Sequence, residues 1–288
     1  MFEGFELRHV KVNGVEIAFR IGGKGAPLLM LHGFPQTHAM WAQIAPKLAS
    51  SFTVVCSDLR GYGASGKPLG VEHYSFMEMG IDQLELMSKL GFEKFRLIGH
   101  DRGARTAHRM ALEAGERLQS LVLMDIVPTH LLLDQLSKEV ARAYYHWLFL
   151  AQPSPFPETL IQANPDYYYE SCLLGWGAGR ISDFAPDQLA AYRAAWRDAD
   201  TIRAMCDDYR AAIDYDFALD DADLERKVKV PTLILWGADG AMAKNYDMRQ
   251  TWRDRLETFE TATVPGGHFF PDTAPEATTA KLLEFLRE

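Results

Sequence analysis

The sequence LIGHDRGA, residues 97–104, has the glycine spacing of a G-x-S-x-G turn but carries aspartate where serine would stand. The preceding run FRLIGH is apolar like a buried strand, and RGARTAHRMALEAG after it has helical periodicity that ends at Gly115. Asp101 is therefore predicted on a sharp turn from strand to helix, where Gly99 and Gly103 leave room for the chain to reverse. The alternative, an aspartate that only caps the helix, needs no flanking glycines.

Further apolar runs predict a mostly parallel sheet around this turn. The runs PLLMLHG, FTVVCSD, FRLIGH, SLVLMDI and TLILWG are apolar as strands buried on both faces are, and helical patterns separate them. Before them, LRHVKV and VEIAFRI flank Asn13-Gly14, a signal for a two-residue hairpin turn. Between residues 129 and 228 the strand rhythm stops. The sequence thus predicts an α/β core, residues 1–128 and 229–288, with a helical cap inserted at 129–228.

Composition limits the possible partners. The chain has 288 residues, 48% hydrophobic and 24% charged, which is enough to bury a large core. A formal charge of −9 without a lysine or arginine run argues against nucleic acid and anionic membranes. No apolar run is long enough for a signal peptide or a membrane span, so we expect a cytoplasmic protein. Cys56, Cys172 and Cys206 form no CxxC pair, and we expect reduced thiols, no metal and no cofactor.

A carboxylate at position 101 suits attack on a saturated carbon. Serine would form an ether there, which water and a histidine base cannot cleave. Aspartate forms an alkyl ester instead, and activated water hydrolyses that ester at its carbonyl carbon. Asp101 is therefore predicted to be the nucleophile for a carbon–halogen bond or an epoxide.

Three further elements would complete such a site. The backbone N–H groups of Phe34, in MLHGFPQTHAMW, and of Arg102 are predicted to form an oxyanion hole. The base is predicted to be His268, on a glycine-rich loop before the C-terminal helix, and we expect His100 to point elsewhere.

Two residues compete to be the acid that orients the base. Asp125 and Asp239 both follow apolar strands, and both satisfy the chain order of nucleophile, acid and base. We favour Asp125, with Asp239 as the open alternative.

The motifs HGFPQTH, DLRGYGASGKP, GHDRGAR, MDIVPT, YYHWLFLAQPSPFPE and CDDYRAAIDYD together resemble the fluoroacetate (haloacetate) dehalogenases of the α/β-hydrolase fold. The likeness covers nearly the whole chain. Epoxide hydrolases and haloalkane dehalogenases share the HGFP motif and the turn that carries Asp101. The Arg102/Arg105 pair and His146-Trp147 are the features that favour the haloacetate dehalogenases over these two groups. The resemblance implies hydrolysis of a haloacetate to glycolate and halide through an aspartyl ester, the acid at Asp125, and a homodimer.

The positions of the two arginines indicate anion binding independently of the resemblance. Arg102 and Arg105 lie one helical turn apart at the positive end of a helix, where two cations are unfavourable unless an anion binds. They are predicted to clamp the carboxylate of a 2-haloacid substrate. The alternative is that they pair with acids such as Asp58 or Asp82, while Arg109, further along, is expected in a structural ion pair.

The resemblance assigns halide binding to His146, Trp147 and Tyr209. Their imidazole, indole and phenol groups can donate hydrogen bonds to departing fluoride, which leaves poorly without strong donors. We expect the other tyrosines of the cap mostly to pack: Tyr144, Tyr145, Tyr167, Tyr168, Tyr169 and Tyr215.

Two rival functions stay open at this point. An epoxide hydrolase shares the aspartate nucleophile and uses two cap tyrosines, which this cap can supply, but it needs no arginine clamp. A non-catalytic small-molecule sensor of the same fold need not keep a nucleophile, an oxyanion hole and a base together. Sequence leaves the preferred halogen and the 2-substituent undetermined.

Overall fold

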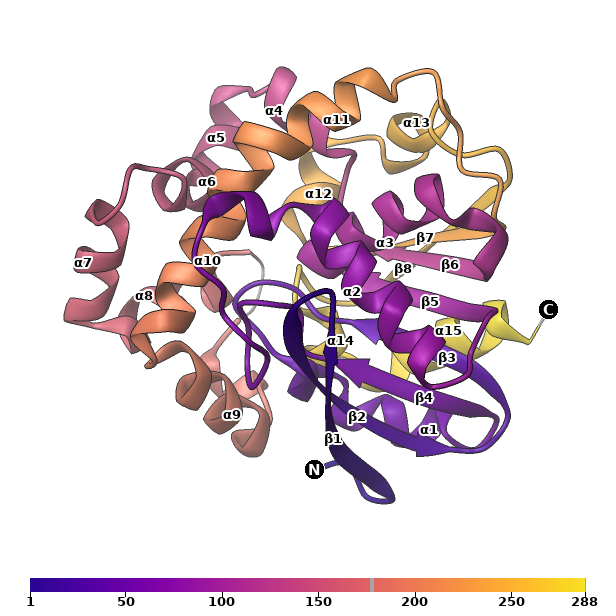
Figure 1. Ribbon diagram of the computed structural model, residues 1–288. Helices are drawn as coiled ribbons and strands as arrows, with labels where there is room; N and C mark the ends of the chain where they lie inside the picture. The colour runs from indigo at the N-terminus through magenta and orange to yellow at the C-terminus, as the bar shows by residue number, and fades with distance from the viewer. Residues whose placement is uncertain (177–178, 288) are drawn as a thin grey trace.

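The computed structural model describes residues 1–176 and 179–287. These residues form a central sheet of eight strands (Figure 1). The strand order is β1-β2-β4-β3-β5-β6-β7-β8. The first two strands run antiparallel to their neighbours and the others are parallel. The strands are β1 Phe5–Val12, β2 Val15–Gly23, β3 Ala26–Leu31, β4 Phe52–Ser57, β5 Phe95–His100, β6 Leu118–Met124, β7 Thr232–Gly237 and β8 Phe259–Val264.

The helices occupy the connections between these strands. The α-helices are α1 Ala45–Leu48, α2 Phe76–Lys89, α3 Arg102–Glu113, α4 Thr129–Asp134, α5 Lys138–Ala143, α6 Tyr145–Leu150, α7 Phe156–Ala163, α8 Pro165–Gly175, α9 Pro186–Trp196, α10 Ala199–Ala211, α11 Phe217–Ala222, α12 Ala241–Asn245, α13 Met248–Trp252, α14 Phe270–Thr273 and α15 Pro275–Leu286. Shorter 3-10 helices are η1 His38–Gln43, η2 Val71–Tyr74, η3 Gly115–Arg117 and η4 Ile181–Asp183, and a π-helical turn, η5, spans Ala212–Asp216.

The predicted α/β class with a mostly parallel sheet is confirmed. Residues 28–31 of β3 and 121–124 of β6 are fully buried, as expected where helices cover both faces of a sheet. The opening hairpin also forms as predicted, because Asn13 and Gly14 both take positive φ, 44° and 76°, which suits the tight turn between Val12 and Val15.

The helices fall into two groups. In Figure 1, α2 and α3 pack together in front of the sheet, whereas α1 and α15 lie behind it. Helices α4 to α11 all come between β6 and β7, and in Figure 1 they lie along the top and the left side of the molecule, beside one end of the sheet. Within the described residues, none of these helices is long and apolar enough to cross a membrane. The three cysteines are free and buried.

Candidate active site

Asp101 stands at the turn between β5 and α3, in a strained backbone conformation with φ 49° and ψ −115°. Such conformations cost about 1–3 kcal/mol and are concentrated at functional sites. The turn needs its glycines, because a Cβ on Gly99 would lie 2.4 Å from the carbonyl oxygen of Gly103, and one on Gly103 would lie 2.4 Å from the carbonyl oxygen of His32. The sharp turn predicted from the glycine spacing is therefore present.

His268 lies between two carboxylates. Its Nδ1 is 2.6 Å from Oδ2 of Asp125, and its Nε2 is 3.9 Å from Oδ2 of Asp101. The other oxygen of Asp125 accepts a hydrogen bond of 3.2 Å from the amide of Gly237. Asp239 is exposed and accepts instead from the amide of Gly266 at 3.1 Å, in the loop that carries His268. The structure thus brings Asp125, rather than Asp239, to the histidine.

The charges at this turn favour an ionised nucleophile. Burial raises the pKa of Asp101, but His268, His100 and the two arginines outweigh it, so its pKa falls below 3.8. Burial likewise lowers the pKa of His268, but the hydrogen bond and charge of Asp125, followed by the charge of Asp101, raise it above 6.5 overall. Asp101 is therefore a carboxylate at neutral pH, and the two carboxylates beside His268 favour its protonated form.

His100 does not point away from the site, contrary to our expectation. Its ring centre is 4.6 Å from that of His268, and its Nε2 lies 2.8 Å from the backbone carbonyl oxygen of His268. Burial lowers the pKa of His100 to about 4, so the ring is neutral and donates its Nε2 proton to that carbonyl. The side chain of His100, at the end of β5, therefore holds the loop that carries His268.

Two backbone amides are available beside the Asp101 carboxylate. The N–H of Phe34 donates to its Oδ1 at 2.8 Å. Arg102 is the first residue of α3, where backbone N–H groups have no partner within the helix. The predicted oxyanion-hole residues thus flank Asp101.

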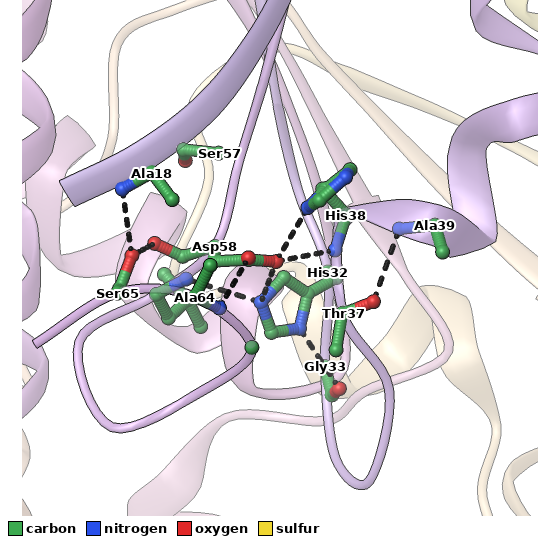
Figure 2. Close-up of polar contacts among 12 residues, drawn as sticks. Ala18, His32, Gly33, Thr37, His38, Ala39, Ser57, Asp58, Ala64 and Ser65 are labelled. Carbon is green, nitrogen blue, oxygen red and sulfur yellow. Dashed lines mark hydrogen bonds and ion pairs between the residues drawn. The ribbon is translucent and has the colours of Figure 1, made fainter. Parts of the chain in front are cut away.

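A buried polar network holds the loop of Phe34 in place (Figure 2). Asp58 accepts from the backbone N–H of His38 at 2.7 Å and from its Nδ1 at 2.8 Å. Burial lowers the pKa of His32 to about 4, so its ring is neutral. Its Nε2 accepts from the N–H of Leu59 at 3.0 Å, which leaves Nδ1 to donate to the carbonyl of Gly33, also at 3.0 Å. This network fixes the residues on either side of the glycine turn.

Arg102 is paired, but with a different acid from those considered above. Its Nε donates to Oδ2 of Asp208 at 2.9 Å, and its Nη2 donates to the other carboxylate oxygen and to the backbone carbonyl of Asp208. Asp58 and Asp82 have other partners, since Asp82 binds Arg60 at 2.6 Å. Only Nη1 of Arg102 has no hydrogen-bond partner in the described residues. The acid that pairs with Arg102 is therefore Asp208 from the helical insertion, and Nη1 is the nitrogen of Arg102 left for a ligand.

Arg105 differs from its neighbour because no ion pair joins it to an acid in the described part of the chain. Its Nη1 donates to the carbonyl of Val127 and to Oγ1 of Thr129, both at 3.0 Å, and its buried Nε is unpartnered. Burial lowers the pKa of Arg105 from its usual value, yet an arginine remains charged. A buried cation with neutral partners has an unbalanced positive charge that can attract an anion. Arg109, by contrast, pairs with Asp223 and Glu113, as expected.

Three buried donors from the helical insertion face the same region. Nδ1 of His146, Nε1 of Trp147 and the hydroxyl of Tyr209 have no hydrogen-bond partner among residues 1–176 and 179–287. Their rings contact one another, with centres 5.4 Å apart for His146 and Tyr209 and 5.2 Å apart for Trp147 and Tyr209. Phe34 packs against two of them, at 5.7 Å from His146 and 5.1 Å from Tyr209. These donors thus lie beside the residue whose amide binds Asp101.

The guanidinium groups of Arg102 and Arg105 pack against the same cluster of rings. The guanidinium carbons of Arg102 and Arg105 lie 4.9 and 4.8 Å from the ring centre of Trp147. Burial lowers the pKa of His146 well below its usual value, so this ring is a neutral donor. An anion bound here would therefore meet neutral donors and the two guanidinium groups together.

Sequence reasoning missed two contacts of the site. Asp208 was not singled out, although it directly precedes Tyr209 in the motif CDDYR. Trp176 packs 4.2 Å from the ring centre of His146, and its carbonyl accepts from the amide of His268 at 2.8 Å. No motif marks Trp176. The packing expected for the cap tyrosines is wrong for three of them, because Tyr145, Tyr167 and Tyr215 have exposed fractions of 46, 74 and 43%.

Comparisons with known proteins show the family to which the chain belongs. The family model for the alpha/beta hydrolase fold matches residues 26–275. A fluoroacetate dehalogenase from Burkholderia sp is 51% identical over 100% of this chain and 96% of its own length. A soluble epoxide hydrolase from Corynebacterium sp. (strain C12) is 29% identical, covering 97% of both chains. A crystal structure from Nostoc sp PCC 7120, whose name gives the same fold, has a TM-score of 0.97 and 47% identity over 99% of both chains.

Proposed function

The chain belongs to the fluoroacetate dehalogenase family of the α/β-hydrolase fold, and we propose that it converts haloacetates to glycolate and halide through an ester on Asp101. It is a hydrolase acting on carbon–halide bonds. The observation that carries this proposal is the set of buried, unpartnered donors next to an ionised aspartate, on His146, Trp147 and Tyr209. Buried donors without partners are costly, and a bound anion offsets that cost.

The first step is displacement at the α-carbon. Oδ1 of Asp101 is held by the amide of Phe34, so Oδ2 is the oxygen free to attack. The Oδ2–carbon bond forms as the carbon–halogen bond breaks, and the halogen leaves with its electron pair. No proton moves in this step. The three donors stabilise the charge that develops on the halide, while the arginines hold the substrate carboxylate.

The second step hydrolyses the ester. His268 takes a proton from water through Nε2, and the water oxygen attacks the Cγ carbon of Asp101. The amides of Phe34 and Arg102 stabilise the oxyanion formed on Oδ1. Collapse of this intermediate breaks the Cγ–Oδ2 bond, and Oδ2 leaves in the glycolate product, which takes up the proton held by His268. The regenerated carboxyl group of Asp101 loses the remaining proton of the attacking water to solvent. Asp125 holds the ring of His268 and stabilises its protonated form.

The pKa of His268 should also change during the reaction in the direction that the base needs. The charge of Asp101 is one of the causes that raise the pKa of His268. Esterification removes that charge. The pKa of the histidine therefore falls when a neutral base is needed.

Halide release tests this function directly. The protein is incubated with fluoroacetate, chloroacetate and bromoacetate, and with styrene oxide as an uncharged control for an epoxide hydrolase. Halide and glycolate are expected in equal amounts from at least one haloacetate, with no diol from styrene oxide. Diol without halide would replace the proposal with epoxide hydrolysis.

The helical segment 129–228 acts in this proposal as a cap that supplies the leaving-group donors. A homodimer and a cytoplasmic location are proposed on the family likeness alone. Sedimentation of the purified protein and fractionation of the source cells test these two proposals. A monomer or a membrane-bound fraction would contradict them.

A further inference from the structure

The two active-site arginines have opposite electrostatic surroundings. Arg102 shares two nitrogens with the carboxylate of Asp208, and both side chains are fully buried. Arg105 is also buried, but its protein partners are a carbonyl and a hydroxyl, which are neutral. The positive charge of Arg102 is thus balanced inside the protein, whereas that of Arg105 is not.

Asp208 is bound as a carboxylate. Besides Arg102, the hydroxyl of Tyr62 donates to its Oδ2 at 2.6 Å. Burial raises the pKa of Asp208 overall, although Arg102 and Tyr62 act to lower it, and Asp208 in turn raises the pKa of Arg102. Because every side chain that contacts the carboxylate is a donor, these contacts suit the ionised form.

The Asp208 pair also determines which part of Arg102 remains available. With Nε and Nη2 engaged, Nη1 is the nitrogen left without a partner in the described residues. The next residue on α10 is Tyr209, whose ring centre lies 4.3 Å from the guanidinium carbon of Arg102. Asp208 therefore connects an arginine of the core to a donor of the cap.

We propose that Asp208 is a positioning residue that neutralises Arg102 and aims its single free nitrogen, so that Arg105 alone supplies the unbalanced charge that attracts the substrate carboxylate. The proposal rests on the proposed function of this site. It divides the clamp into an orienting arginine and a charge-supplying arginine. The site then holds its anionic substrate in one alignment without trapping the anionic products.

The first test measures anion affinity separately from turnover. Asp208→Asn keeps the shape of the side chain but removes its charge, so the positive charge of Arg102 is no longer balanced inside the protein and can attract an anion. Calorimetry with glycolate is expected to show about tenfold tighter binding, the size of one charged hydrogen bond. For chloroacetate, kcat and KM should both fall, with kcat falling about tenfold or more because the α-carbon is misaligned.

The matched control is Asp223→Asn. It removes the carboxylate from Arg109, another arginine of α3, outside the proposed site. Glycolate affinity and kcat should stay as in the unmodified protein. If Asp208→Asn binds glycolate equally or more weakly while remaining folded, Asp208 is only structural and the proposal is wrong. If the unmodified protein releases no halide, the proposed function fails instead.

A second variant keeps the proposal testable if Asp208→Asn does not fold. The double variant Arg102→Gln with Asp208→Asn replaces a neutral ion pair with a neutral amide pair. It should lose about tenfold or less in glycolate affinity, for the one hydrogen bond from Nη1, whereas Arg105→Gln should lose about 100-fold. Equal losses in the two proteins would overturn the division between the arginines.

Discussion

The core and cap sides of the site treat their polar atoms in opposite ways. On the core side, Asp101, His268 and Asp125 satisfy one another or are satisfied by backbone amides. On the cap side, His146, Trp147 and Tyr209 each bury a donor that no atom of the described residues accepts. Paired polar groups fix the positions of the side chains, whereas buried donors without partners are available to bind a ligand.

This difference separates chemistry from selectivity. An aspartate, a histidine and two amides perform the ester cycle on any substrate whose carbon they reach. In the proposed mechanism, the donors of the helical insertion and the arginines decide which leaving group and which substrate charge are accepted. Relatives with other substrates can therefore share the core arrangement, and changes on the two sides should produce different kinetic signatures.

The largest effect in the steady state is expected on the core side, at the acid. Asp125→Ala should lower kcat by about 10³–10⁴, because His268 loses its orientation and the support for its protonated form. Asp239→Ala is the matched control and should keep most of the activity, because this residue is exposed and binds only a loop amide. Circular dichroism must show both variants folded. The reverse ranking would place the acid at Asp239.

On the cap side, the effect should depend on the halogen. Trp147→Phe keeps most of the packing but removes one N–H donor, and we expect kcat for fluoroacetate to fall about 10²–10³. Chloroacetate and bromoacetate should lose less, because a larger and softer halide needs less help to leave. Fluoride and chloride electrodes measure these rates. An equal loss for all three substrates would show that the halide does not meet this donor.

The next effect concerns the substrate carboxylate. Arg105→Lys keeps the charge but removes the planar fork, so KM for chloroacetate should rise and kcat should fall, by about 10–100-fold in kcat/KM. The comparison uses Asp125→Ala, for which most of the loss should be in kcat. Unchanged kinetics in Arg105→Lys would move the carboxylate away from this residue.

The smallest effect is expected from pH. Ester hydrolysis needs neutral His268, so kcat should rise with pH and fall about tenfold per unit below the pKa of the base. Because the ester removes the charge of Asp101, this pKa should lie below the pKa of His268 in the free protein, which the charges of Asp125 and Asp101 raise and which NMR can measure. A kcat that increases towards acid would contradict the role of His268.

Local features could be predicted from the sequence, and distant pairings could not. The turn at Asp101 is specified by glycines within four residues and by the apolar strand before it, so a short window identifies it. Asp208 lies 106 residues from Arg102, and nothing near either residue indicates their contact. Helical spacing placed Arg102 and Arg105 correctly on one face of α3. It could not reveal that an acid from the cap neutralises only one of them.

The same limit explains the other differences. The position of His100 at the end of β5 could be predicted from the strand pattern. The loop of His268 that its side chain contacts comes from a distant part of the chain. The residues alone left Asp239 open beside the favoured Asp125, because the choice depends on where two strand ends lie relative to His268. These are properties of the sheet order, which adjacent residues do not encode.

The central claim is an ester on Asp101, and His268→Gln tests it most directly by intact-protein mass spectrometry after incubation with chloroacetate. Displacement needs no base but hydrolysis does, so the variant should release one chloride per site and gain the mass of one carboxymethyl group on Asp101. Asp101→Asn, treated in the same way, should show neither. A folded His268→Gln protein that stays unmodified while it continues to release chloride would contradict the two-step account.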